Sequence, residues 1–325
     1  MIQIRRSGIL LPGSDKDLER LRDEFNSSHC ILLPNLFEVS LLEFIQDRIA
    51  QAEFYQRVHD DIVPPAVDLC LKDDTTIGLL HFLVNDQHFF DMVQQITGFG
   101  PIGCFSGSVY RMDPELPHSD SWHDDLIEHR ILAMSVNLSP DVYSGGILQI
   151  RNRHSGHIVH EVANTGFGTG IVFKLTPDLE HRVSNVEGQV AKTAFAGWFK
   201  SQPDYHILLE ENYSKAKSNH EGIAKSQLWD SDYSLTLNSK VRIPDGVIYR
   251  NGVEETSIFD IDAGLCYGLD AVGSRAWKLL ADSGSLQTLF RGMAEEYDVS
   301  AKDLGEDILN LANELLAKGL IKIID

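Results

Sequence analysis

Cysteine is scarce in this chain, and disulfide patterns are absent. Only four of the 325 residues are cysteine, and no C-x-x-C pair occurs. Scattered cysteines are typical of reduced proteins rather than of secreted domains stapled by disulfides. The N-terminus lacks the apolar core of a signal peptide, and no apolar run approaches the ~20 residues of a membrane-spanning helix. We therefore expect a cytoplasmic protein that has no membrane partner.

Positive charge is also in short supply. The chain has 28 Lys and Arg residues against 48 Asp and Glu residues, which gives a formal net charge of −20. Proteins that bind the phosphate backbone of nucleic acids need a basic patch, so this charge balance argues against a nucleic-acid partner. A basic peptide or a small metabolite suits such a surface better.

Several motifs of common enzyme classes are missing. The run GFGTG at residues 166–170 does not match G-x-G-x-x-G and does not open a helix, which excludes a dinucleotide-binding fingerprint. The chain has no P-loop, no H-E-x-x-H and no G-x-S-x-G. These absences exclude P-loop nucleotide hydrolysis, zincin-type proteolysis and the serine chemistry of α/β-hydrolases.

The distribution of apolar residues predicts two folded parts. Residues 40–58 and 78–96 carry apolar side chains at three- and four-residue spacing, which predicts a mainly helical region up to about residue 100. From about 103 to 200, short apolar runs alternate with Gly, Pro, Asn and Asp, which predicts the short strands of a sandwich or small barrel.

A polar stretch separates this part from the rest of the chain. Residues 211–236 show no apolar periodicity, so we expect a first domain of residues 1–212, a linker of residues 213–237 and a second domain of residues 238–325. The second domain begins with three short strand candidates and continues with three amphipathic helices. The predicted fold class is therefore mixed α/β, with a compact α+β module at the C-terminus.

The run SWHDDLIEHR, residues 121–130, concentrates two histidines, two aspartates and a glutamate. If it lies in a strand or in the fraying end of one, His123 and Asp125 project from one face and Asp124 from the other. A same-face histidine and carboxylate supply two ligands of the 2-His-1-carboxylate triad, which leaves positions open on non-haem Fe(II). The alternative is a solvated acidic turn.

A third ligand should be a histidine on a later strand. His154, His157 and His160 belong to a run that resembles a polar, solvent-facing hairpin. His181 instead follows the apolar run GIVFKL and a turn, so it can enter a barrel at the start of a strand. The separation of 56 positions from Asp125 to His181 leaves room for the intervening strands of a closed double sheet.

Lys192 lies eleven residues after His181 and shares a strand face with Ala194 and Ala196. A lysine among small residues on an inward face is costly to bury unless it pairs with an anion. If the face points outward, the lysine is simply solvated. On an earlier strand, Ala133, Ser135 and Asn137 form a small polar face suited to a lumen that admits a small dicarboxylate.

These features together resemble the Fe(II)/2-oxoglutarate-dependent dioxygenases, and in particular their prolyl-hydroxylase-like branch. The matching features are H-x-D, a distant histidine, a following lysine and an aromatic W-F pair. The runs VYRM before H-x-D and NLSPDVYSGGILQI after it add to the resemblance, which covers roughly residues 28–200.

The resemblance implies a fold, cofactors and residue roles. The implied fold is a double-stranded β-helix of the jelly-roll or cupin type, in which His123, Asp125 and His181 bind Fe(II). Lys192 would pair with the distal carboxylate of 2-oxoglutarate, Tyr110 would help to hold this cosubstrate together with Asn137, and O2 would be the oxidant. Halogenases of this family replace the carboxylate ligand by a small residue, so Asp125 favours hydroxylation or another oxidation.

Residues 238–325 resemble the PqqD-like peptide chaperones of pyrroloquinoline quinone biosynthesis. The resemblance rests on the runs GVIYRNGVEETSIFDIDAGLCYGL and LLAKGLIKI and on the helix that contains Trp277. It implies that the module binds the leader of a ribosomally made precursor peptide as an added strand. The implied peptide-binding residues are Leu265, Cys266, Tyr267, Leu269, Leu309 and Asn313.

The sequence therefore predicts an oxygenase that hydroxylates a precursor peptide recruited by its C-terminal domain. Tethering raises the effective concentration of the reactive side chain at the iron. One alternative is a small-molecule hydroxylase whose C-terminal domain is a scaffold or dimerisation element. A third reading is a peptide-binding adaptor with an inactive barrel, and the intact His123, Asp125, His181 and Lys192 argue against it.

Overall fold

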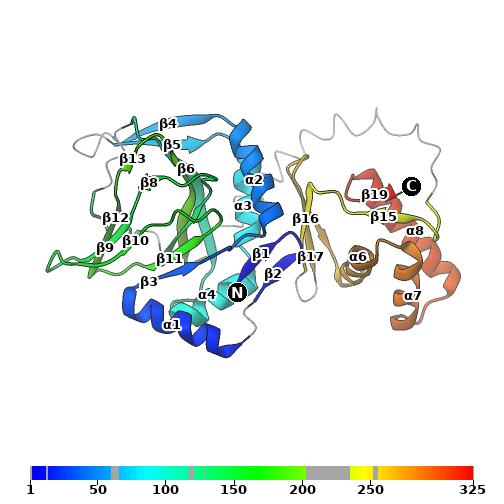
Figure 1. Cartoon of the computed structure of the whole chain (residues 1–325). Helices are drawn as coiled ribbons and strands as arrows, with labels where there is room; N and C mark the ends of the chain where they lie inside the picture. The colour runs from blue at the N-terminus through cyan, green and yellow to red at the C-terminus, as the bar shows by residue number, and fades with distance from the viewer. Residues whose placement is uncertain are drawn as a thin grey trace. The chain divides into compact units, whose positions relative to one another are not determined.

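The structure is a computed structural model that describes residues 2–11, 14–59, 66–116, 121–127, 129–202, 235–251 and 255–324. The chain divides into two compact units (Figure 1). Unit 1 comprises residues 1–5 and 9–207, and unit 2 comprises residues 6–8 and 208–325. Most of the predicted linker, residues 213–237, lies outside the described residues, and the predicted domain boundaries stay predictions.

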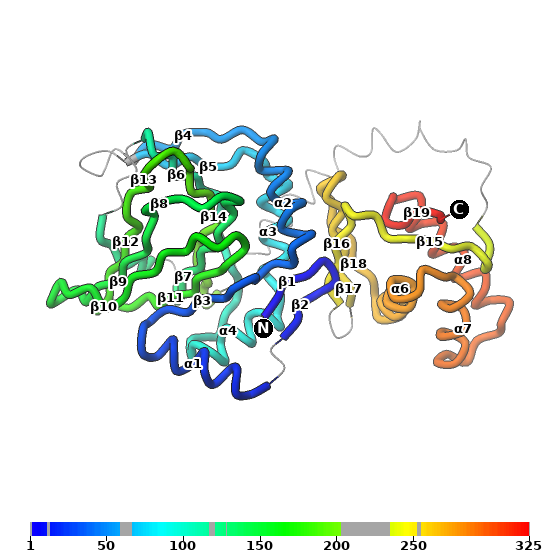
Figure 2. Tube along the Cα trace, in the orientation of Figure 1, coloured from blue at the N-terminus to red at the C-terminus, as the bar shows by residue number. Residues whose placement is uncertain are grey.

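A large antiparallel sheet forms the main layer of unit 1. Its seven strands follow the order β3-β11-β7-β14-β6-β5-β4. Their bounds are β3 Cys30–Leu33, β11 Gly170–Lys174, β7 Arg130–Asn137, β14 Lys192–Lys200, β6 Cys104–Met112, β5 Ala66–Leu71 and β4 Phe54–His59. Figure 2 shows β3 beside β11, although the two strands are far apart in the sequence.

A smaller layer consists of the three-stranded sheet β10-β9-β12, and the strands of the pair β13-β8 flank it in chain order, β8 before β9 and β13 after β12. The bounds are β10 Ile158–Val162, β9 Leu148–Asn152, β12 Leu179–Val183, β13 Val186–Glu187 and β8 Ser144–Gly145. A bridge between His123 and His181 adds residue 123 to the free edge of β12. A further pair, β1 Gln3–Arg5 and β2 Gly8–Leu10, opens the chain.

The path of the chain between the two layers defines the fold. From β6 the chain goes to the bridge residue His123, back to β7, across to β9 and β10, back to β11, across to β12 and finally back to β14. This repeated alternation between a large and a small antiparallel sheet is the double-stranded β-helix. The predicted fold class is confirmed.

The helices of unit 1 pack on the outer face of the large sheet. They are α1 Asp15–Ser28, α2 Val39–Gln51, α3 Asp74–Val84 and α4 Gln87–Thr97. Phe195 of β14 contacts the His81 ring of α3, and Phe199 contacts Phe89 and Phe90 of α4. Because side chains alternate along a strand, residues 192, 194, 196 and 198 of β14 face the interior between the two sheets.

The helix predicted over residues 40–58 is wrong in its second half. Helix α2 ends at Gln51, and residues 54–59 form β4, which pairs with β5. The aromatic and β-branched side chains of this segment fit a pleated surface, and pairing with β5 decides the outcome over helical periodicity. The second predicted helical stretch is two helices, because Asp86 interrupts it and accepts a hydrogen bond from the His88 amide as the N-cap of α4.

Unit 2 contains the three-stranded sheet β16-β17-β18 and three helices around their own core. The bounds are β16 Val247–Asn251, β17 Thr256–Asp260, β18 Leu265–Leu269, α6 Ala271–Ser283, α7 Leu286–Glu296 and α8 Ala301–Ala317. The core centres on Trp277, which is fully buried. This is the α+β module that the sequence predicts.

One strand prediction in unit 2 needs correction. Residues 241–250 do not form one strand but belong to two different sheets, since Lys240–Arg242 (β15) pairs with Lys322–Ile324 (β19) instead of continuing into β16. Pro244, which has no N–H to give to a ladder, lies between them. Across the described ranges of both units, no helix is long and apolar enough to cross a bilayer.

Candidate metal centre and cosubstrate pocket

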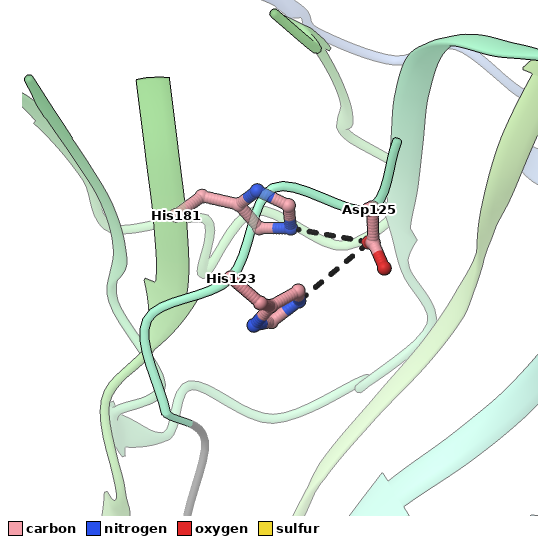
Figure 3. Close-up of side chains that lie close together, drawn as sticks. All are labelled: His123, Asp125 and His181. Atoms are coloured by element: carbon pink, nitrogen blue, oxygen red, sulfur yellow. Dashed lines mark ion pairs between the residues drawn. The ribbon is translucent and has the colours of Figure 1, made fainter. Parts of the chain in front are cut away.

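The three side chains predicted as metal ligands lie close together in unit 1. The possible ligand atoms of His123, Asp125 and His181 all lie within 4.8 Å of one another. Nε2 of His181 is 3.3 Å from Oδ2 of Asp125, and Nε2 of His123 is 3.6 Å from the same oxygen (Figure 3). The cluster lies between the two sheets, with His181 buried and the other two side chains half-buried.

The backbone places the two histidines side by side. The amide of His123 donates to the carbonyl of His181 at 3.1 Å, and the amide of His181 donates to the carbonyl of His123 at 2.8 Å. Directly opposed residues of antiparallel strands point to the same face, and the two ring centroids are 4.3 Å apart. Of the two alternatives, a strand or the fraying end of one, the structure shows the second, because pairing stops at His123 and Asp125 has a left-handed backbone with φ of 56°.

A hydrogen bond fixes which nitrogen of His123 is available. Nδ1 of His123 lies 2.6 Å from the carbonyl oxygen of Ser121. A carbonyl can only accept, so Nδ1 donates a hydrogen bond to it, and Nε2 is the nitrogen that faces Asp125. Metal-binding histidines typically have this kind of partner on the second nitrogen. The arrangement leaves Nε2 of His123 as the ligand atom, directed at Asp125.

Two side chains that the sequence did not select hold the carboxylate of Asp125. The indole Nε1 of Trp198 donates to Oδ2 at 2.8 Å, and Nη1 of Arg130 donates to Oδ1 at 3.4 Å. The guanidinium of Arg130 stacks on the Trp198 ring at 3.6 Å. The alternation of side chains along the strand could have identified Trp198, because residue 198 follows residues 192, 194 and 196 on the inward face.

The environment of Asp125 favours the ionised carboxylate. Burial raises the pKa of this carboxyl, but hydrogen bonds from His123 and His181 and the charges of these histidines outweigh burial and hold the pKa far below its ordinary value. An ionised carboxylate is the form that binds a cation.

The other histidine candidates lie elsewhere. His154 is at the tip of the β9–β10 hairpin, where its side chain is 76% exposed and 3.3 Å from Asp178. His157 is exposed, and His160 is half-buried on β10. Asp124 also faces away from the triad, since it binds Arg153 at 2.8 Å. Glu128 lies outside the described residues.

Lys192 lies on the inner face of β14 and is buried, with 8% of its surface exposed. The alternative reading of an outward, solvated lysine is therefore wrong. Its ammonium donates to the carbonyl of Gly146 at 2.8 Å and lies 5.8 Å from the centre of the Tyr143 ring. A Cβ at Gly146 would lie 2.9 Å from Cδ of Lys192, so only glycine leaves room for this side chain.

Asn137 and Tyr110 share the inner face with Lys192. Both lie directly opposite Ala194, Asn137 on β7 and Tyr110 on β6. Asn137 is buried, and no described residue accepts a hydrogen bond from its Nδ2. Burial raises the pKa of Tyr110, which keeps its phenol protonated at neutral pH. Three neighbouring strands thus present an ammonium, an amide and a phenol to one space.

These donors fit the groups that the sequence resemblance implies. Two imidazoles and one carboxylate form the ligand type that non-haem Fe(II) uses. The buried Lys192 ammonium supplies a positive charge, and the buried Asn137 Nδ2 has no acceptor among the described residues. Because buried donors ordinarily have acceptors, the two groups suit a small anion such as a dicarboxylate. The residues present therefore match an iron and 2-oxoglutarate site.

In unit 2 the residues expected to bind a peptide lie on an edge strand and on a helix. Within the described part of the chain, β18 pairs with β17 on one side and with no strand on the other. Tyr267, Leu269 and, on α8, Leu309 pack against the core of unit 2, while Asn313 is exposed. Leu265 and Cys266 are half-buried, and burial raises the pKa of the Cys266 thiol to about 11.

Comparison with known proteins assigns both regions. Residues 107–200 match the 2OG-Fe(II) oxygenase superfamily, and residues 255–321 match the family of coenzyme PQQ synthesis protein D (PqqD). The search of curated proteins gave no match.

Similar solved structures exist for each region. An oxidoreductase of the 2OG-Fe(II) oxygenase family from Burkholderia pseudomallei is 13% identical, with 62% of this chain and 97% of that chain covered at a TM-score of 0.44. A prolyl-4-hydroxylase from Pseudomonas putida is 15% identical, with coverage of 57% and 99% at a TM-score of 0.42. TbiB1, solved in complex with the TbiA(beta) leader peptide, is 28% identical, with coverage of 25% and 94% at a TM-score of 0.25.

The fold assignment rests on the strand order described above, and the family assignment rests on the two family matches. The oxygenase match begins within β6 and ends with β14, so it contains His123, Asp125, His181 and Lys192. The match to that superfamily implies Fe(II), 2-oxoglutarate and O2. One region of the chain thus matches the 2OG-Fe(II) oxygenase superfamily, and a second region matches the PqqD family.

Proposed function

We propose that this protein is an Fe(II)- and 2-oxoglutarate-dependent oxygenase that hydroxylates a residue of a ribosomally made precursor peptide. The observation that carries the proposal is the cluster of His123, Asp125 and His181 within 4.8 Å, in a chain that also contains a PqqD domain. The cluster supports the oxidative chemistry, and the second domain supports a peptide as the substrate.

In this proposal each residue of unit 1 has a defined task. His123, Asp125 and His181 hold Fe(II), which together with 2-oxoglutarate supplies the O2 activation needed to hydroxylate a C–H bond. Trp198 and Arg130 orient the carboxylate of Asp125 through both of its oxygens. Burial of His181 limits access of bulk water to the iron side of the pocket.

Lys192 is the residue that recognises the cosubstrate. Its buried ammonium would exchange part of its hydrogen bonding to the Gly146 carbonyl for a charge-assisted bond to the distal carboxylate of 2-oxoglutarate. The Nδ2 of Asn137, which lacks an acceptor among the described residues, and the phenol of Tyr110 are the neutral donors nearby. A cation with two neutral donors distinguishes a dicarboxylate from a neutral molecule.

Unit 2 would deliver the substrate. An extended leader peptide can add a strand to the open edge of β18, where main-chain hydrogen bonds give affinity and side-chain pockets give specificity. Because leader and core belong to one peptide, binding of the leader raises the local concentration of the core at the iron. The active site itself then needs little affinity for the residue that it oxidises.

The test is a mass measurement on peptides encoded next to the gene for this protein. The purified protein is incubated aerobically with Fe(II), 2-oxoglutarate and each synthetic peptide. We expect one peptide to gain the mass of an oxygen atom, with succinate formed in equal amount. Stimulation of succinate formation by a small molecule but by no peptide would contradict the proposal and favour the small-molecule hydroxylase.

A further inference from the structure

The segment that carries two of the three proposed iron ligands is held by few backbone contacts. Residues 121–127 pair with β12 only through the two hydrogen bonds between His123 and His181. Pairing ends there because Asp125 is left-handed. The distance between His123 and His181 must nevertheless be well defined if both are to bind one metal ion.

Side chains on the opposite face of this segment supply what the backbone lacks. Trp122 precedes His123 and points to the other face of the small sheet, where two guanidinium groups lie against its ring. The Arg151 guanidinium lies 4.2 Å from the ring centre, and that of Arg182 lies 4.6 Å away. Asp124, also on this face, binds Arg153 at 2.8 Å.

Arg151 and Arg182 are in turn held by hydrogen bonds between β9 and β12. Arg151 donates two hydrogen bonds to Oε2 of Glu180, at 2.7 and 2.8 Å. Arg182 donates to Oε1 of Gln149 at 2.7 Å. Glu180 and Arg182 flank His181 in β12, just as Trp122 and Asp124 flank His123. On the outer face of the small sheet, contacts between charged and aromatic side chains therefore join the same two segments that the His123 and His181 backbones join.

We propose that Trp122 and Asp124 are positioning residues that lock His123 and Asp125 against His181 from the outer face of the small sheet. The inference rests on the proposed function only in taking these three residues as the metal ligands. The Trp122 ring contacts one guanidinium from β12 and one from β9, so a shift of the segment along β12 would lose these cation–π contacts. The ion pair with Arg153 holds Asp124 beside the end of β9.

Loss of the Trp122 and Asp124 contacts should weaken metal binding. Residues that orient metal ligands typically change metal affinity by about 10- to 100-fold when they are replaced. We expect Trp122→Leu, which keeps an apolar side chain but has no π face, to weaken metal binding at least about tenfold. Trp122→Phe keeps a ring for the arginines and should stay within about threefold of the natural protein. Asp124→Asn removes only the ion pair with Arg153, and its metal affinity should lie between those of Trp122→Leu and Trp122→Phe.

The experiment uses Co(II) as a spectroscopic probe on full-length, metal-free protein. Visible absorption bands report the coordination of Co(II), and titration gives its affinity. Amide hydrogen exchange at His123 and His181 in the same metal-free samples gives a second readout that is independent of metal. We expect both amides to exchange faster in Trp122→Leu and to recover in Trp122→Phe. His154→Ala, which changes an exposed histidine of the neighbouring hairpin, is the matched control and should match the natural protein.

The outcomes separate the two proposals. If the natural protein fails to bind Co(II), the metal site of the proposed function is refuted, while the exchange data still test the positioning role. If the natural protein binds Co(II) and Trp122→Leu binds it equally with unchanged exchange, the positioning role is refuted. Should Trp122→Leu fail to fold, Asp124→Asn decides the question by the same two readouts.

Discussion

Unit 1 and unit 2 offer different parts of the polypeptide for recognition. In unit 1, polar side chains from β6, β7, β12 and β14 and from residues 121–125 converge between two sheets, and their distances define the site. In unit 2, the side chains pack into a core, and the feature left open is the main-chain edge of β18. Single side-chain changes should therefore disable unit 1, whereas unit 2 should respond mainly to changes that affect its backbone.

The largest effect is expected at the triad. His181→Ala removes a ligand and should abolish both Fe(II) binding at stoichiometric concentration and 2-oxoglutarate turnover, as should His123→Ala and Asp125→Ala. Metal analysis after desalting and succinate formation measure the two losses. His154→Ala is the control that should retain both. Full turnover in the His181→Ala protein would rule out this ligand set and return attention to the histidines of the β9–β10 hairpin.

Removing unit 2 should separate chemistry from recruitment. A chain that ends at residue 225 keeps the triad, so we expect slow 2-oxoglutarate decarboxylation without substrate to persist. Activity on a full precursor should fall by about 10²- to 10⁴-fold at low peptide concentration, because the tether no longer raises the local concentration of the core. Unit 2 added back as a separate chain should restore only part of the rate. Equal rates for the truncated and intact proteins would show that unit 2 does not recruit the substrate.

Lys192→Ala should affect the cosubstrate and spare the metal. Loss of a desolvated charge pair costs about 2–5 kcal/mol, which corresponds to a rise of roughly 30-fold or more in the apparent KM for 2-oxoglutarate. Fe(II) affinity should be unchanged. Lys174→Ala is a suitable control, because Lys174 pairs with Leu132 on the opposite face of the same sheet. An unchanged KM in the Lys192→Ala protein would mean that another group binds the distal carboxylate.

A backbone change in β18 should weaken peptide binding more than a side-chain change does. Tyr267→Pro removes an N–H from the strand, and we expect precursor affinity to fall about tenfold, the effect of losing one to two hydrogen bonds. Tyr267→Val loses the aromatic contact but keeps the strand, so it should bind the precursor more tightly than the proline variant. Titration of a labelled precursor compares the two, with thermal unfolding as a check on folding. Similar affinities would argue against strand addition at β18.

The smallest effect tests the fit of the lysine. Gly146→Ala places a Cβ against Lys192 at a left-handed position with φ of 58°, whereas Gly156→Ala carries a similar backbone cost at φ of 68° with open space around it. Both variants should lose about 1–2 kcal/mol of stability. Only Gly146→Ala should also raise the KM for 2-oxoglutarate by several-fold, since only there does the lysine have to move. Equal KM values would show that Lys192 tolerates displacement.

Strand alternation predicted much of the site. It gave the inward face of β14, because Lys192 and Ala194 follow a period of two that the antiparallel partners on β6 and β7 repeat. The short strands predicted between about residues 103 and 200 are confirmed for the same reason. The start of α8 also follows a local pattern, because Ser300 accepts a hydrogen bond from the amide of Asp303, only three residues further on.

Features that depend on contacts outside the local segment could not be predicted from the sequence. The pairing of β15 with β19 joins segments about eighty residues apart, and no local pattern encodes it. Residues 54–59 satisfy both helical and strand spacing, and only the neighbouring β5 selects the strand. Arg130 reaches Asp125 because β7 begins beside the triad, which depends on the closure of the two sheets.

The left-handed backbone of Asp125 bears on how this centre can be redesigned. Glycine adopts a φ of 56° without strain, whereas alanine does not, so Asp125→Gly removes the carboxylate and relaxes the main chain in one step. The Trp198 N–H and the Arg130 guanidinium, which now hold the carboxylate, would then line the vacated space. A hydrogen-bond donor and a cation beside an open coordination position suit an external anion, which makes residue 125 the natural starting point for engineering a halide-accepting variant of this oxygenase.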